Sequence, residues 1–479
     1  MYKLPKSYST SLYSNRFGLL TFVCLSLLTA AVLAITPKTT PPLQHTGSVE
    51  INTKLSQTKL VQGEMSTIYL DVSIKPPSLD IAQSTQRASD IIVILDRSGS
   101  MSGANKMPYA KAAIRDLLSR LNEHDRFALV SFANNAIVHS SLAPVNTARR
   151  EHLLETVNNI QAGGGTNIGE GLSHAVRLLT ANQQNRASKV LLLSDGQANQ
   201  GIKDLTGLSR IVTQITQQES VLSSIGMGLD FNETLMSSLA DYGMGTYAYL
   251  ENLSGLGDIF THSLNATRNI YAANSNLTLN LANSIELIDA GGYPISKDKN
   301  NNYIIKTGQL LNHNNKKFVM TFHVRAQETG NIVLGKMHLT YQVKGENRQQ
   351  VLSPELLSLA VVKPDQRQAA ITSIDQDVYK QSWLKNNLGR MQKKLSHYVR
   401  AGNKDKADQA INEYRDELAK AEKQAAMPIV SEEMDDRLNE MESSVAEAFS
   451  GSRSDQEVKR KRAAKSMQMG SFKEQRAVQ

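Results

Sequence analysis

Three short polar segments in this sequence carry carboxylate and hydroxyl side chains at spacings that suit a metal ion. The first, DRSGSM, presents Asp96, Ser98 and Ser100 directly after the apolar run IIVIL. The second, GGGTN, carries Thr166, and the third, LLLSDG, contributes Asp195. Such oxygen ligands suit a hard cation, so we expect Mg²⁺, with Mn²⁺ or Ca²⁺ as alternatives. The absence of His and Cys from the set argues against zinc and copper.

The elements that must position these residues are short apolar strands that alternate with helical stretches between residues 90 and 267. The predicted strands are IIVIL, RFALVSF, KVLLLSDG, VLSSIGMG and TYAYL. Strands this apolar, separated by helices, predict an α/β domain with a doubly wound, mostly parallel sheet that is covered on both faces. Ligands of such sheets bind beyond the carboxyl ends of the strands. We therefore expect the five side chains to meet at that edge.

The segments that flank the α/β domain show a different pattern. Residues 46–80 and 272–362 alternate apolar and polar side chains, as in SVEINTKLSQTKLVQGEMSTIYLDVSIK and NIVLGKMHLTYQV, which is typical of antiparallel strands. The first segment holds too few strands to bury a face by itself. We expect both segments to form one antiparallel β-sandwich, into which the α/β domain is inserted.

The remainder of the chain is predicted to be helical and then irregular. Residues 366–450 contain apolar positions at three-to-four spacing, interrupted by AGNKDK, which predicts a helical hairpin. We expect its apolar stripe to pack against a neighbouring element, with a partner helix or self-association as the alternative. Residues 451–479 contain eight Lys or Arg and three Asp or Glu. We interpret this basic tail as disordered, with contact to anionic lipid as the alternative.

The N-terminus has the features of an export signal. Basic residues precede the uncharged segment 17–35, and a polar, proline-bearing linker follows at 36–45. We interpret residues 1–35 as a signal peptide or an N-terminal membrane anchor. Either outcome predicts an exported chain, periplasmic or anchored in the inner membrane facing the periplasm. The only cysteine, Cys24, lies in the apolar segment, so the exported body would have no disulfide.

DRSGSM, GGGTN and SDGQAN, in this order, resemble the metal-ion-dependent adhesion site of the von Willebrand factor type A domain. The resemblance covers about residues 90–267 and implies that Asp96, Ser98, Ser100, Thr166 and Asp195 hold the metal. It also implies ligand binding rather than catalysis. The wider layout resembles bacterial exported homologues of calcium-activated chloride channels, although one apolar segment cannot line a pore.

These observations lead to two hypotheses for function. In the first, the chain is an extracytoplasmic protein-binding or adhesion module whose metal ion is completed by an Asp or Glu of a partner protein. In the alternative, it is a membrane-anchored scaffold whose sandwich and helices bind partners while the metal is structural only. We do not expect an enzyme, because no motif places a general base. We expect no nucleic-acid partner for an exported protein.

Overall fold

The computed structural model describes residues 48–77, 88–180, 186–251, 255–343, 345–352, 357–430 and 432–476. The predicted signal or anchor at 1–35 and the linker at 36–45 lie outside these ranges. In the part of the chain that the structure describes, no helix has the length and apolar character needed to cross a bilayer.

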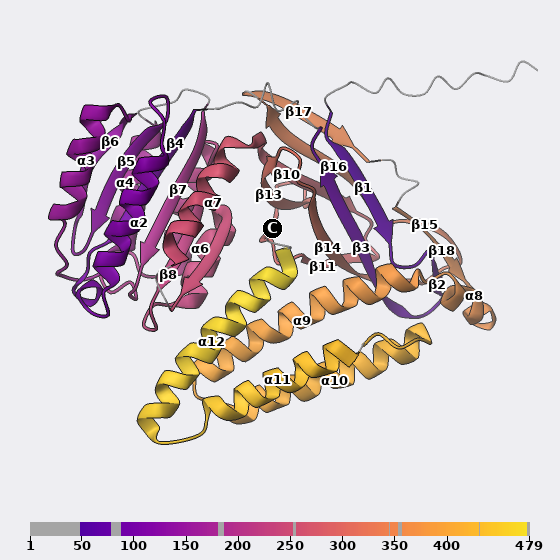
Figure 1. Ribbon diagram of the computed structural model, residues 1–479. Coiled ribbons are helices and arrows are strands. Elements are labelled where there is room, and N and C mark those ends of the chain that lie inside the picture. Colours follow the sequence, from indigo (N-terminus) through magenta and orange to yellow (C-terminus); the bar gives the residue numbers. More distant parts are fainter. Residues whose placement is uncertain are drawn as a thin grey trace, which may run out of the picture. The chain divides into compact units, whose positions relative to one another are not determined.

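A six-stranded sheet forms the centre of the α/β domain (Figure 1). Its strand order is β6-β5-β4-β7-β8-β9, and all pairs are parallel except the edge pair of β5 with β6. The strands are β4 (Ser89–Asp96), β5 (Arg126–Phe132), β6 (Ala136–Pro144), β7 (Ala187–Ser194), β8 (Ser220–Met227) and β9 (Met244–Leu250). The mostly parallel sheet is confirmed, whereas β6 was not foreseen.

Helices cover both faces of this sheet because successive strand residues point to opposite sides. Ile91, Val93 and Leu95 of β4 belong to the core that includes α2, α3 and α7. Ile92 and Ile94 belong to the core that includes α4, α5 and α6. The helices are α2 (Lys106–Arg120), α3 (Thr147–Asn159), α4 (Ile168–Thr180), α5 (Leu205–Gln217), α6 (Glu233–Tyr242) and α7 (Leu256–Arg268), and a short 3-10 turn spans Gly99–Ser102.

Two antiparallel sheets flank the α/β domain in sequence and share one apolar core. Their strand orders are β1-β3-β14-β11 and β12-β13-β10-β16-β17, and a small third sheet has the order β15-β18-β2. Strand β3 pairs with β14 over ten residues, so the segments before and after the α/β domain join as the alternating patterns predict. The strands are β1 (Glu50–Leu55), β2 (Lys59–Val61), β3 (Met65–Lys75), β10 (Ile270–Leu281), β11 (Ile285–Ala290), β12 (Ile295–Lys297), β13 (Tyr303–Leu311), β14 (Lys316–Arg325), β15 (Gly330–Val333), β16 (Gly335–Val343), β17 (Glu346–Val351) and β18 (Ser358–Val362).

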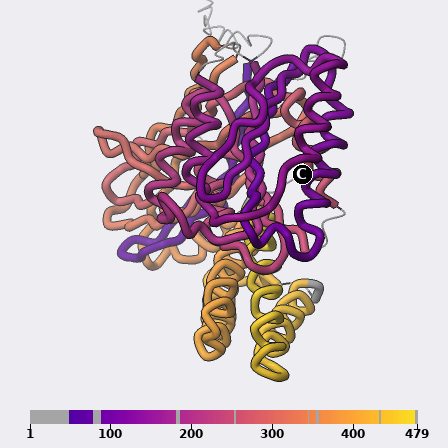
Figure 2. The backbone as a smooth tube through the Cα atoms, turned by 90° about the vertical axis from the view of Figure 1, so that its left-hand side faces the viewer, coloured from indigo at the N-terminus to yellow at the C-terminus, as the bar shows by residue number. Residues whose placement is uncertain are grey.

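The C-terminal part is helical beyond the predicted hairpin. A 3-10 turn at Pro364–Gln366 and a short helix α8 (Arg367–Thr372) precede four longer helices, which are α9 (Gln376–Arg400), α10 (Lys404–Ala425), α11 (Glu432–Ala448) and α12 (Arg453–Arg476). Helices α9 and α10 form the expected hairpin, with the break at residues 401–403. Figure 2 gives a second view of these four helices below the sheets.

The prediction that residues 451–479 are disordered was wrong for the residues that the structure describes. Helix α12 packs along α9 and also contacts α6 and β9 of the α/β domain. The buried face of α12 consists largely of polar and small side chains. Lys465 and Ala464 are fully buried, and Ser471 Oγ donates a hydrogen bond to the Gly389 carbonyl at 2.7 Å. Three of its basic residues have acidic partners in the α/β domain, which a composition argument does not reveal: Lys461 pairs with Asp230, Arg462 with Glu251 and Lys465 with Glu233.

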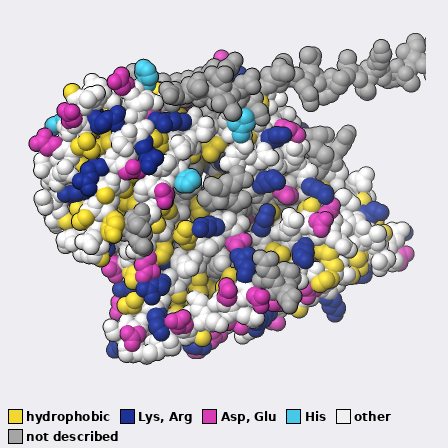
Figure 3. All heavy atoms as spheres, viewed as in Figure 1, with side chains coloured by type: hydrophobic (Ala, Val, Ile, Leu, Met, Phe, Trp, Pro, Cys, Tyr) yellow, Lys and Arg dark blue, Asp and Glu magenta, His cyan; other side chains and the backbone are white. Residues whose placement is uncertain are grey.

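The exposed surface of the helical region carries charges of both signs. Arg390 pairs with Glu417 at 3.1 Å and Lys394 pairs with Glu413 at 3.1 Å, both between α9 and α10. Figure 3 shows basic and acidic side chains interspersed over this part of the molecule. Such exposed pairs contribute little stability each.

Candidate functional site

Three loops meet at the carboxyl edge of the parallel sheet, where backbone hydrogen bonds fasten them together. The Gly99 amide donates to the Gly164 carbonyl at 3.0 Å, and the Gly163 amide donates to the Arg97 carbonyl at 2.7 Å. The Asn199 amide donates to the Thr166 carbonyl at 3.1 Å. These bonds fix the loops after β4, before α4 and after β7 relative to one another.

The two candidate carboxylates lie at the bottom of this loop cluster and are fully buried. Asp96 Oδ1 accepts the Ser98 amide at 2.8 Å, and Asp96 Oδ2 accepts the Ser194 hydroxyl at 2.6 Å. Asp195 Oδ1 accepts the Ser100 hydroxyl at 2.9 Å. Because both oxygens of Asp96 already accept hydrogen bonds from the protein, its orientation is fixed before any ligand arrives.

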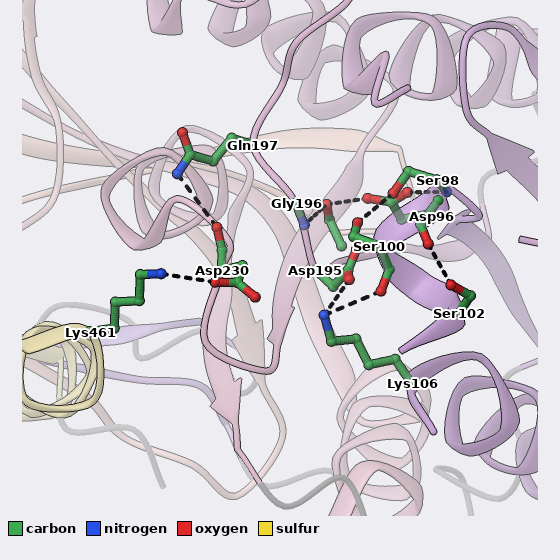
Figure 4. A network of polar contacts seen from close by, with 12 residues as sticks. Asp96, Ser98, Ser100, Ser102, Lys106, Asp195, Gly196, Gln197, Asp230 and Lys461 are labelled. Carbon is green, nitrogen blue, oxygen red and sulfur yellow. Dashed lines mark hydrogen bonds and ion pairs between the residues drawn. The ribbon is translucent and has the colours of Figure 1, made fainter. Parts of the chain in front are cut away.

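The three candidate hydroxyls surround the same small space, and Figure 4 shows two of them, those of Ser98 and Ser100, beside Asp96 and Asp195. Ser98 Oγ and Ser100 Oγ lie 3.0 Å apart. A Cβ added at Gly196 would lie 3.2 Å from Thr166 Oγ1 and 3.7 Å from Ser100 Oγ, so these two hydroxyls face one point in front of Gly196. The structure therefore brings together all five residues that the sequence singled out.

The GGGTN loop reaches this position because its glycines allow it. Gly164 has a φ of +89°, which side chains rarely adopt. A Cβ on Gly165 would lie 2.9 Å from Asn134 Oδ1 and from Asn199 Oδ1, closer than real contacts allow. Asn199 Oδ1 also accepts the Thr166 amide at 2.8 Å, which holds the threonine in place.

Lys106, in the first turn of α2, is a member of the cluster that sequence reasoning missed. Its Nζ donates to Asp195 Oδ2 at 2.6 Å and approaches the Ser100 carbonyl at 3.4 Å, and the residue is only 6% exposed. The lysine compensates one of the two buried carboxylates. Among the described residues of the cluster, Asp96 has no such cationic partner.

Burial raises the pKa of Asp96 to about 6, although hydrogen bonds from Ser194 and Ser98 act in the opposite direction. The neighbouring carboxylate of Asp195 also raises the pKa of Asp96, but by less than burial does. A carboxylate in this state is under-compensated, and a nearby cation would stabilise its charged form.

A pocket of about 300 Å³ lies directly in front of the cluster. Ser100, Thr166 and Asp195 line one side of it, and Arg400 and Lys461 from the C-terminal helices line the other. Lys461 Nζ pairs with Asp230 Oδ1 at 3.2 Å, as Figure 4 shows. Arg400 Nη1 lies 3.7 Å from Glu233 Oε2 and is buried without a hydrogen bond.

The donor set fits a hard divalent cation rather than zinc or copper. Within the described ranges, no three His, Cys, Asp or Glu side chains come together as a metal site. The carboxyl edge of the sheet instead presents three hydroxyls and two carboxylates. Their outward-facing lone pairs remain available to a cation. Mg²⁺ keeps several of its waters and accepts such ligands, directly or through water.

Comparisons with known sequences place the α/β domain in a family. A model of the von Willebrand factor type A domain matches residues 90–262. The uncharacterized protein YfbK of Escherichia coli (strain K12) is 29% identical over 169 residues, which are 35% of this chain and 29% of YfbK. The bovine inter-alpha-trypsin inhibitor heavy chain H4 is 30% identical over 158 residues, which are 32% of this chain and 17% of that protein. This chain thus matches less than a third of either relative's length.

Solved structures extend the likeness in fold beyond this domain. The von Willebrand factor type A protein from Catenulispora acidiphila aligns over 85% of this chain and 91% of its own, with a TM-score of 0.64 and 15% identity. The ArnB paralog VWA2 from Sulfolobus acidocaldarius aligns over 88% of this chain and 99% of its own, with a TM-score of 0.55 and 18% identity. Together with the sheet order and the family match, these likenesses identify residues 90–262 as a von Willebrand factor type A domain.

Proposed function

We propose that this chain is a divalent-metal-dependent protein-binding module, and that an Asp or Glu of a partner protein completes the metal's coordination. The observation that carries the proposal is that three hydroxyls and two buried carboxylates meet in one loop cluster, where the Ser100 and Thr166 hydroxyls face one point in front of Gly196. Domains of this type commonly mediate metal-dependent protein interactions. We propose a binding role rather than a catalytic one.

In this proposal, Ser98, Ser100 and Thr166 hold Mg²⁺ through their hydroxyl oxygens. Asp96 and Asp195 act at least partly through water, because their oxygens already accept hydrogen bonds from the protein. The bound ion supplies a Lewis-acidic position that remains open to an anionic oxygen. Two carboxylates and the Lys106 ammonium leave the cluster with one net negative charge, so a divalent ion would carry a net positive charge to the partner.

The pocket in front of the cluster supports an acidic partner. Arg400 and Lys461 face the same space as the candidate metal ligands, and Arg400 Nη1 has no hydrogen-bond partner among the described residues. We therefore expect a second acidic group of the partner near Arg400, because Lys461 already pairs with Asp230. A guanidinium in a partly buried place recognises carboxylates well.

The proposal is tested by comparing partner capture from cells by the full chain and by the variants Ser98→Ala and Thr166→Ala, with Mg²⁺ and with chelator. Capture should require the ion and be lost in both variants. Ser102→Ala is the matched control, because this exposed serine only donates to the Gly99 carbonyl and lies outside the hydroxyl set. Capture that is unchanged in excess chelator would refute the proposal.

A second candidate is a scaffold in which the metal is structural and the sandwich and helices bind partners. It is favoured by the contacts that tie α12 to the α/β domain, such as the Arg462 pair with Glu251 at 2.6 Å. In that case Ser98→Ala would lower the melting temperature in Mg²⁺ but leave partner capture intact. Measurement of both quantities on the same variants separates the two candidates.

We also propose that the chain acts outside the cytoplasm, in the periplasm or anchored to the inner membrane. The basis is the basic and apolar character of residues 1–35, which resembles an export signal. Fractionation of cells followed by N-terminal sequencing of the mature protein tests this, and recovery of the intact chain in the cytoplasm would contradict it.

A further inference from the structure

Lys189 is a buried cation that has no partner among the residues that the structure describes. It lies near the start of β7 and is 6% exposed. No hydrogen bond or ion pair to its ammonium is present among the described residues. Burial alone lowers the pKa of this lysine to about 8, with no contribution from a neighbouring charge. An unpaired buried ammonium is costly, so a chain that keeps one gains stability from any anion that reaches it.

A cavity of about 170 Å³ gives an anion access to this lysine. Its walls come from the α/β domain (the amino ends of β7, β8 and β9, with one residue of α7), from the sandwich (the end of β13, the start of β14, their turn and Tyr293), and from α12. The volume exceeds that of one water several times over and suits a small ligand.

The polar groups of this cavity are basic or neutral. Gln309 Nε2 is buried and has no hydrogen-bond partner within the described part of the chain. Lys316 and Lys317 add two further ammonium groups, of which Lys316 Nζ already donates to the Gln309 carbonyl at 2.7 Å. Among the described residues that line the cavity, none is Asp or Glu. Two donors that have no partner among the described residues, the Lys189 ammonium and the Gln309 amide, thus line one cavity. The described lining of this cavity contains no acidic side chain.

We propose that this cavity is a binding site for a small oxyanion, a phosphate or a carboxylate, which the Lys189 ammonium and the Gln309 amide hold. The site lies at the amino edge of the sheet, opposite the candidate metal site at the carboxyl edge, and is independent of it. A bound anion would join the α/β domain to the sandwich and to α12, because all three contribute walls.

The test is a thermal-shift titration of the full chain with inorganic phosphate, sulfate and succinate in excess chelator, against chloride at matched ionic strength. At least one oxyanion should raise the melting temperature in a saturable manner. In Lys189→Met its apparent affinity should fall at least tenfold, and in Gln309→Leu by a smaller factor. Lys189→Met should fold, because the lysine has no partner to lose.

Two controls give the test a clear outcome. Lys299→Met removes an exposed lysine that does not line the cavity and should leave the oxyanion response unchanged. Arg400→Gln removes the cation beside the metal site and should also leave it unchanged. The proposal is overturned if no oxyanion stabilises the chain beyond chloride, or if Lys189→Met responds as the unaltered chain does. Either result leaves the metal proposal untouched.

Discussion

The two edges of the α/β sheet each bury two aspartates, but they compensate them in different ways. At the amino edge, Asp90 pairs with Arg126 and with Arg186, and Asp125 pairs with Arg268 at 2.5 Å. At the carboxyl edge, Asp96 and Asp195 have one lysine, Lys106, and otherwise hydroxyl and amide donors.

This difference indicates at which edge the chain itself compensates the charge of its buried carboxylates. Three arginines balance two carboxylates at the amino edge, so these carboxylates need no bound metal ion. One lysine balances two carboxylates at the carboxyl edge, and burial raises the pKa of Asp96 to about 6. Buried aspartates at the amino edge therefore form complete ion pairs with arginines, which is a structural role. Buried aspartates at the carboxyl edge lack positive charge, which is typical of a binding site.

The largest expected effect is at the closed edge. Asp90→Asn should lower the free energy of unfolding by about 3–5 kcal/mol, because it leaves the buried Arg126 guanidinium without its carboxylate. Asp96→Asn in chelator should change it by less than about 1 kcal/mol, because an under-compensated charge is removed. Urea denaturation of both variants measures the contrast, and equal losses at the two edges would break the comparison.

The next effect concerns Lys189, a cation at the amino edge that has no carboxylate partner among the described residues. A folded-state pKa of about 8, against 10.5 for the ordinary lysine, penalises the folded chain below pH 8 by about 3 kcal/mol, since each pKa unit is about 1.4 kcal/mol. The penalty disappears as pH rises from 8 to 10.5, because there the unfolded chain binds the extra proton. The other charged groups at the cavity, Lys316 and Lys317, have the same sign.

The quantity to measure is the free energy of unfolding of the anion-free chain minus that of Lys189→Met. Denaturation of both chains at several pH values between 7.5 and 10 gives this difference. This difference should move in favour of the unaltered chain as the pH rises. A difference that is flat with pH would show that the lysine is compensated after all.

A smaller effect sharpens the account of the open edge. Lys106→Met removes the ammonium at 2.6 Å from Asp195 and should tighten Mg²⁺ binding about tenfold, which is about 1.4 kcal/mol. It should weaken partner capture, because the bound ion would then carry less net positive charge. Calorimetry with Mg²⁺ measures the first quantity, with Lys111→Met on the same helix as control. Weaker Mg²⁺ binding in Lys106→Met would contradict this role.

The smallest effect is expected at the exposed rim beside the carboxyl edge. Arg462→Gln removes the pair with Glu251, whose side chains are 54% and 39% exposed, and should cost less than about 1 kcal/mol. Thermal denaturation at low and at high salt measures it. A loss of several kcal/mol would mean that α12 is held by its surface charges rather than by buried groups such as Lys465 and Ser471.

The sequence predicted the fold and the five candidate residues because their signals are local. Apolar runs that end on Asp96 and Asp195 predict strand ends, and parallel strands bring their carboxyl ends to one edge. Alternating segments on both sides predicted the sandwich, and the β3–β14 pairing agrees with it. Each of these inferences needs only the residues of one element and the rule for joining it to the next.

The remaining members of the site depend on contacts between distant segments. Lys106 reaches Asp195 only because the chain turns at Asn105, which has a φ of +57°. Arg400 and Lys461 come from helices that no motif links to the metal loops. Helix α12 lacks a clear apolar stripe, because its buried face consists largely of small and polar side chains that find partners in α9 and the α/β domain.

The most direct test of the central claim is isothermal titration of the metal-free chain with Mg²⁺ and, in parallel, Mn²⁺. We predict saturable uptake of one ion per chain that disappears in Thr166→Ala and persists in Ser102→Ala. Absence of uptake by the unaltered chain, or equal uptake by Thr166→Ala, would contradict a metal site at the carboxyl edge.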